Sequence, residues 1–130
     1  MKVIAFVGAS GTGKSHRAAW VAKEHDVDFI IDDGILIKGG AILAGVSAKR
    51  ESTRIASIRR ALFLDEMHAA EVIDAIKQHE VQSILILGTS TRMVERIANT
   101  LNIGNIAQYV YIEDISTAFE INQALSNRKN

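Results

Sequence analysis

The sequence contains no cysteine and no proline, and only 5% of its residues are aromatic. Without cysteine the chain forms no disulfide framework, holds no thiolate-bound zinc and performs no thiol chemistry. Nothing in the sequence explains the missing proline. Because hydrophobic residues still make up 48% of the chain, a full core must be built mainly from isoleucine, valine, leucine and alanine. At 130 residues we expect a single domain covering residues 1–130.

An excess of charge of either sign is also absent, since 15 Lys and Arg balance 15 Asp and Glu. A neutral chain argues against a dedicated nucleic-acid or membrane surface, although it allows a local basic patch. No apolar run approaches the ~18 residues that span a bilayer, and the first residues show no signal-peptide pattern. We therefore expect a cytoplasmic protein with no membrane partner, and we do not favour nucleic acid as a ligand.

Residues 8–15 read GASGTGKS and fit the pattern G-x-x-x-x-G-K-[ST]. They follow the apolar run VIAFV at 3–7 and precede a helical pattern, which is the context that a phosphate-binding loop requires. Glycines let successive backbone N–H groups approach phosphate oxygens, and the dipole of the next helix adds positive potential. Lys14 then supplies a charge for the β- and γ-phosphates, and Ser15 supplies a hydroxyl ligand for Mg²⁺.

Through this Walker A motif the sequence resembles the P-loop NTPase superfamily. The resemblance implies nucleotide binding by Gly8, Ser10, Gly11, Thr12, Gly13, Lys14, Ser15 and His16. Lys14 is also a catalytic candidate, because its charge would stabilise the transferring phosphate. No Asn-Lys-x-Asp motif for guanine occurs, so we expect the nucleotide to be ATP, bound with Mg²⁺.

Two acidic stretches could supply the carboxylate that P-loop enzymes use to hold Mg²⁺. The first is Asp32 and Asp33, which follow the apolar run at 29–31; the second is LFLDE at 62–66, which looks more like a Walker B string. Helical spacing runs into the second stretch, so Asp65 is better explained as a helix N-cap. We therefore favour Asp32 and Asp33 as metal ligands and Asp33 as a catalytic residue, against the alternative of a plain Asp-Gly turn.

Residues 3–34 are also similar to the shikimate and gluconate kinases. That partial resemblance implies that acids after the second strand bind Mg²⁺ and the hydroxyl groups of a small substrate.

The fold class expected is α/β, a three-layer sandwich with a mainly parallel P-loop sheet and an inserted β-hairpin. Apolar runs predict buried strands at residues 2–7, 29–31, 84–87 and 110–112. Helical spacing predicts helices at about 15–24, 51–63, 66–79 and 91–101. Gly39 and Gly40 predict the turn of a hairpin over about 35–44, and Thr117 with Glu120 predicts a capping box for a last helix.

In a parallel sheet the ligand lies at the carboxyl ends of the strands, where residues 8–15, 32–33, 88–90 and 113–114 should meet. Thr89 and Ser90 either sense the γ-phosphate or cap the next helix. The basic stretch at 49–60 either closes over the phosphates or pairs with the acidic helix that follows it. The four histidines have no metal-ligand spacing and are expected at the surface.

Two functions remain open at this point. The first is a Mg-ATP-binding protein that hydrolyses or transfers the γ-phosphate, as an ATPase or small-molecule kinase. The second is a nucleotide-dependent regulatory module with little or no turnover. In that case the region 35–60 would contact a protein partner or a second copy of the chain.

Overall fold

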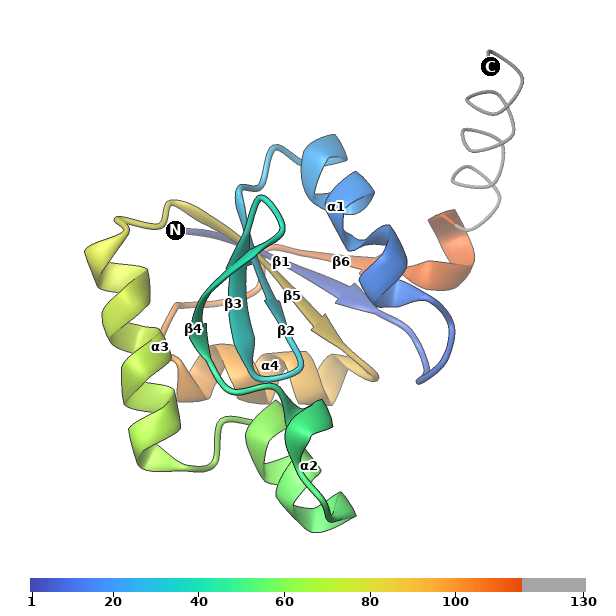
Figure 1. The fold of residues 1–130 in the computed structure, drawn as a ribbon. Coiled ribbons are helices and arrows are strands. Elements are labelled where there is room, and N and C mark those ends of the chain that lie inside the picture. The colour runs from blue at the N-terminus through green and yellow to red at the C-terminus, as the bar shows by residue number, and fades with distance from the viewer. Residues whose placement is uncertain (116–130) are drawn as a thin grey trace.

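The computed structural model describes residues 1–115, which form a six-stranded sheet covered by helices on both faces (Figure 1). The strands lie in the order β4-β3-β2-β5-β1-β6. The four parallel strands are β1 (Lys2–Val7), β2 (Phe29–Asp32), β5 (Ser83–Gly88) and β6 (Gln108–Tyr111). The strands β3 (Ile35–Lys38) and β4 (Ala41–Gly45) add an antiparallel hairpin to the β2 edge. The α/β class, the mainly parallel sheet and the inserted hairpin are thus confirmed.

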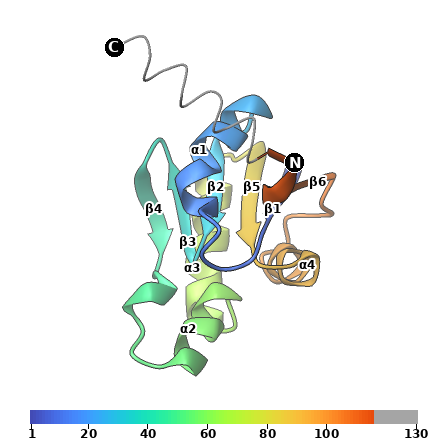
Figure 2. The same cartoon turned by 90° about the vertical axis from the view of Figure 1, so that its right-hand side faces the viewer.

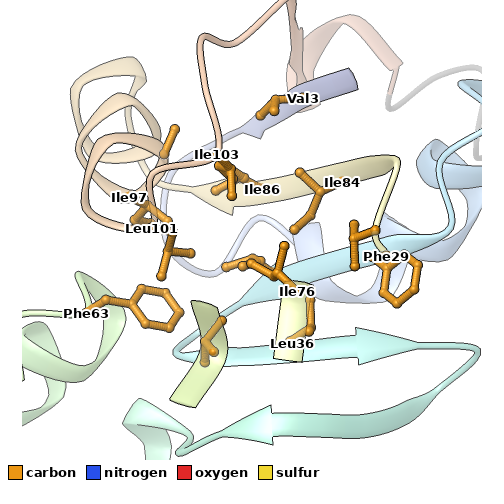
Figure 3. Close-up of a cluster of buried hydrophobic side chains, with 14 of the residues drawn as sticks. Val3, Phe29, Leu36, Phe63, Ile76, Ile84, Ile86, Ile97, Leu101 and Ile103 are labelled. Carbon is orange, nitrogen blue, oxygen red and sulfur yellow. The ribbon is translucent and has the colours of Figure 1, made fainter. Parts of the chain in front are cut away.

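The two faces of the sheet carry separate cores, as strict alternation along β1 requires. Ile4 and Phe6 pack against helix α1 (Lys14–Glu24). Val3, Ala5 and Val7 face the other side, where α3 (Glu66–Gln78) and α4 (Thr91–Thr100) cover the sheet. Figure 2 shows α1 and α4 on opposite sides of β1 and β5. Figure 3 shows the larger core, in which branched aliphatic side chains from sheet and helices outnumber the aromatic ones.

The remaining helical elements are α2 (Arg54–Ala61) and a 3₁₀ turn, η1 (Ala48–Arg50). Residues 112–115 are helical as well. The capping box at Thr117 and Glu120 lies outside the described residues. Within residues 1–115 no helix is long and apolar enough to cross a membrane.

Helix α2 ends two residues before the predicted limit because Phe63 adopts a left-handed conformation, with φ 57°. The amides of Phe63 and Leu64 donate to the carbonyls of Arg60 and Arg59, which is the hydrogen-bond pattern of a Schellman motif. Glycine usually occupies this position, since a Cβ is strained there. Here the ring of Phe63 is fully buried in the larger core, which offsets the strain.

The helical spacing of Ile55 and Ile58 predicts a helix correctly but suggests a buried face that does not exist. Helix α2 has no buried residue, and these two side chains are 75% and 47% exposed. The helix stands beyond the carboxyl ends of the strands and covers neither face of the sheet (Figure 1). The spacing of apolar residues indicates an amphipathic helix, whereas the burial of its apolar face depends on which element packs against that face.

The expectation that all four histidines lie at the surface is wrong for His68. This side chain is 3% exposed on the inner face of α3, and its ring stacks on Phe63 with centroids 4.7 Å apart. Its Nε2 lies 2.7 Å from the carbonyl oxygen of Gly34 and 3.2 Å from the amide nitrogen of Val46. His68 therefore joins α3 to both ends of the hairpin.

Gly34 and Gly45 let the two ends of the hairpin meet backbone to backbone. Both have positive φ, 90° and 99°. A Cβ on Gly34 would lie 2.4 Å from the carbonyl oxygen of Val46, and one on Gly45 would lie 2.3 Å from the carbonyl oxygen of Gly34. Because both obstacles are backbone atoms, no rotamer change relieves them.

We expect Gly34→Ala to lower the melting temperature several degrees more than Gly104→Ala does. Both positions have positive φ, so both variants carry a strain of about 1–3 kcal/mol. Only Gly34 adds an overlap with backbone, since a Cβ on Gly104 meets nothing within 4 Å. Thermal melts followed by circular dichroism make the comparison, and equal losses would contradict the close approach.

Candidate nucleotide site

The glycine loop, residues 8–13, connects β1 to α1 and leaves the start of that helix open. Gly11 and Gly13 have φ of 78° and 86°, and Gly13 is the N-cap of α1 with no side-chain hydrogen bond to its first turn. Free N–H groups at a helix start form a site for an anion, and the helix dipole favours it. The loop thus has the backbone geometry that phosphate binding needs.

Gly8 and Thr12 shape this loop. A Cβ on Gly8 would lie 2.4 Å from Cγ2 of Ile112, so a larger residue would require the Ile112 side chain to move. The hydroxyl of Thr12 donates to the carbonyl oxygen of Ala9 at 2.6 Å, and its amide donates to the same oxygen at 3.3 Å. These contacts close a turn within the loop.

Lys14 folds back into the glycine loop. Its Nζ donates to the carbonyl oxygens of Gly8 and, at 3.1 Å, Ala9. Partial burial lowers the pKa of Lys14 below its usual value, and the nearby carboxylate of Asp32 opposes that shift. The ammonium group therefore lies inside the loop, held by carbonyl groups that a phosphate would replace.

Asp32 reaches α1 across one intervening strand, because β5 lies between β1 and β2. The hydroxyl of Ser15 donates to Oδ2 of Asp32 at 2.6 Å. A hydroxyl and a carboxylate side by side are hard oxygen ligands of the type Mg²⁺ takes, with phosphate oxygens and water completing its shell. Within residues 1–115 no three His, Cys, Asp or Glu side chains form a metal site, so this pair does not form part of an all-protein metal cage.

Asp33 lies at the same edge with a left-handed backbone, φ 54°. Ser47 donates a hydrogen bond to its carboxylate at 3.2 Å, and its carbonyl oxygen accepts from the amide of Ala48 at 2.9 Å. Burial raises the pKa of Asp33, and Asp32 raises it further, while the Ser47 hydroxyl and Lys49 oppose the shift. Asp33 is thus a carboxylate that binds a proton more readily than an exposed one.

Asp65 is the N-cap of α3, as its sequence context predicts. Its Oδ1 accepts from the amides of Met67 and His68 at 3.0 and 3.2 Å. These hydrogen bonds lower the pKa of Asp65, and the one from the His68 amide has the largest effect. Its side chain does not line the hollow beside the glycine loop.

That hollow has a volume of about 520 Å³ and brings together most of the predicted site residues. They are Ser10, Gly11, Gly13, Lys14, Ser15, His16, Asp32 and Asp33. The strand end at 88–89 also lines it, whereas Glu113 and Asp114 are exposed and do not.

Of the two alternatives for Thr89 and Ser90, the structure shows the helix cap, and Ser90 provides it. The hydroxyl of Ser90 accepts from the amide of Met93 at 3.1 Å and caps α4. Thr89 lines the hollow, with its hydroxyl 3.4 Å from Sδ of Met93.

Sequence reasoning gave no site role to Leu87 and Met93, which line the hollow, and it named Lys49 only as part of the basic stretch at 49–60. Lys49 belongs to the basic stretch, but nothing local distinguishes it from its neighbours. In that stretch, Arg60 is the one basic residue that forms an ion pair within residues 1–115. Its Nε lies 2.8 Å from Oε1 of Glu51, and its Nη1 lies 3.8 Å from Oδ2 of Asp65.

Residues 4–114 match the sequence model of the ATPase family associated with various cellular activities (AAA). The chain belongs to the AAA family. Comparisons with curated proteins and with solved structures returned no match. Membership confirms the P-loop superfamily and a nucleotide-binding ATPase domain at the level of the family. The likeness of residues 3–34 to small-molecule kinases gains no support from these comparisons.

Asp33 and Asp65 should respond to pH with opposite signs in this AAA domain. A raised folded pKa means that ionising Asp33 destabilises the fold as pH rises above its unfolded value of about 3.9. Asp33→Asn should therefore gain melting temperature relative to wild type as pH rises from about 3 to 7. Asp65, with its lowered pKa, stabilises the fold above its unfolded value and loses that effect in acid.

Asp65→Asn is the matched control, since asparagine still caps a helix but carries no charge. It should lose melting temperature relative to wild type over the same pH range. Thermal melts of the three proteins at five or so pH values measure both differences. If the melting temperatures of both variants, relative to wild type, changed in the same direction with pH, the environments of the two carboxylates would not differ as described.

Proposed function

We propose that this AAA domain binds Mg-ATP and hydrolyses or transfers its γ-phosphate. The observation that supports this most directly is the contact of 2.6 Å between the Ser15 hydroxyl and the Asp32 carboxylate. It lies beside a glycine loop whose helix start has no side-chain cap and whose lysine points inward. Phosphate, lysine and metal ligands would then share one hollow.

In this proposal the amides of the glycine loop bind the phosphates, and Lys14 exchanges the carbonyls of Gly8 and Ala9 for phosphate oxygens. Its charge then stabilises the negative charge that develops as the γ-phosphate is transferred. Bound phosphate also favours the protonated amine, which reverses the effect of burial on its pKa.

Ser15 and Asp32 would hold Mg²⁺. When bound, the ion would supply positive charge that offsets part of the negative charge of the phosphates. Asp33, with its raised pKa, would accept the proton of the attacking water or hydroxyl group. Thr89, which lines the same hollow, would orient that nucleophile.

A regulatory module with little turnover is the second candidate. The observation in its favour is the exposed apolar surface of α2, where Ile55 and Ile58 are 75% and 47% exposed. Ile42, which is 63% exposed, lies apart from them beside the turn of the hairpin. Such a surface suits a protein partner or a second copy of the chain. Turnover in the isolated domain, measured with and without Mg²⁺, separates the two candidates.

Lys14→Ala should remove most of the stabilisation that Mg-ATP gives. Ligand at about 100 times its Kd adds about 2.7 kcal/mol, which for a chain of this size raises Tm by roughly ten degrees. Lys23→Ala is the control, since that lysine is exposed in the last turn of the same helix. An equal shift by Mg-ATP in Lys14→Ala and in wild type would refute phosphate binding by this loop.

Substitution of each acidic residue should change a different measured property. Asp32→Asn should weaken the Mg²⁺ dependence of ATP binding, and Asp33→Asn should lower turnover by roughly 100-fold with binding retained. Asp65→Asn should leave both unchanged, because asparagine keeps the cap. Isothermal titration and phosphate release, each at several Mg²⁺ concentrations, give the readouts. Loss of Mg²⁺ dependence in Asp65→Asn alone would assign the metal to the other acidic stretch.

A further inference from the structure

A second cavity of about 600 Å³ lies beside the nucleotide hollow. Its walls come from α2, the start of α4, η1 and the strand ends, in the region where Figure 1 shows α2 beyond the sheet. Five residues line both spaces, namely Ser10, Asp33, Lys49, Thr89 and Met93. The two spaces are therefore adjacent, and molecules bound in them would meet at these shared residues.

Four cations converge on this cavity from three elements. They are Lys49 of η1, Arg54 of α2, and Arg92 and Arg96 of α4. Among the residues that the structure describes, none of the four forms an ion pair, whereas Arg60 on the same helix as Arg54 is paired with Glu51. Within the described part of the chain, Asp33 is the one acid in the lining. Like charges gathered in a concave site repel one another and attract an anion.

The rest of the lining is partly apolar. Ile58 and Ala61 of α2 and its C-cap residue Leu62 line the cavity, and Ala48 and Met93 add to this surface. The volume falls within the range of small-molecule sites, about 300–1,000 Å³, which combine an apolar lining with a few polar groups. A simple inorganic anion would leave this apolar wall without a contact.

We propose that the second cavity binds a small organic anion, a carboxylate or phosphate monoester on an apolar body. Arg92 and Arg96, four residues apart on one face of α4, bind the anionic group, since guanidinium groups match carboxylate and phosphate geometry. The apolar body lies against α2. The position of this ligand next to a γ-phosphate rests on the proposed function. The binding of the ligand to the cavity is independent of that function.

The test uses benzoate, phenyl phosphate and the neutral benzamide as probes of the intact chain. A non-hydrolysable ATP analogue with Mg²⁺ first fills the glycine loop, so that phenyl phosphate cannot bind there. Chemical shifts of the Met93 methyl group and the arginine side chains report binding. We expect at least one of the two anions to bind with a Kd in the millimolar range, about that of a fragment, and benzamide at least roughly ten-fold more weakly.

The double variant Arg92→Gln, Arg96→Gln should weaken anion binding by roughly ten-fold or more. Its matched control is Arg50→Gln, Arg59→Gln, which removes two exposed arginines that do not line the cavity. Ile58→Glu provides a second variant with little risk to folding, since this side chain is 47% exposed. Its carboxylate at the cavity should compete with the anion and also weaken binding.

A preference for benzoate or for phenyl phosphate assigns the natural anion to carboxylates or phosphates, and either supports the proposal. Equal binding of benzamide, unchanged binding in both cavity variants, or no binding of either anion at about 10 mM overturns it. Failure of the proposed function is seen separately, as the absence of stabilisation by Mg-ATP. Benzoate titrated without nucleotide, in wild type and in Lys14→Ala, still tests the cavity in that case.

Discussion

The close backbone approach between Gly34 and residues 45–46 determines the geometry of half of the site. Because neither glycine tolerates a Cβ there, the hairpin returns directly to the end of β2. The amide of Ala48 can then donate to the carbonyl oxygen of Asp33, and Ser47 can donate to its carboxylate. His68 completes the junction from α3, so the inserted hairpin is what brings Lys49 to the hollow.

The other half depends on the order of the strands. With β5 between β1 and β2, the carboxyl end of β2 lies across the sheet from the glycine loop, and Asp32 meets Ser15. A parallel sheet buried on both faces fixes this relation firmly, since β1 and β5 are apolar on both sides. The site is therefore formed by loops whose ends are held by the most buried part of the molecule.

The parts predictable from sequence are those that depend on local pattern. Strand and helix periods, the GASGTGKS loop and the cap at Asp65 each involve residues a few positions apart. His68 could not be predicted, because its burial follows from contacts with Gly34 and Phe63 that no local pattern reveals. The exposure of Ile55 and Ile58 could not be predicted either: their helix has the expected period, but none of its residues is buried. Lys49 could not be singled out from the basic stretch at 49–60, because its place depends on the junction of the hairpin with β2.

Burial shifts the pKa values of Lys14 and Asp33 in opposite directions, and both shifts disfavour the charged form. It lowers the pKa of the lysine and raises that of the aspartate, so the nucleotide-free site disfavours the ionised form of each group. A bound phosphate would favour the ammonium of Lys14, and a cation beside Asp32 would remove part of the repulsion that acts on Asp33. The cost of burying these groups is therefore offset on binding. Lys14 and Asp33 are thus held in place before a charged ligand binds. A site that is ordered in this way can bind charge without rearranging its side chains.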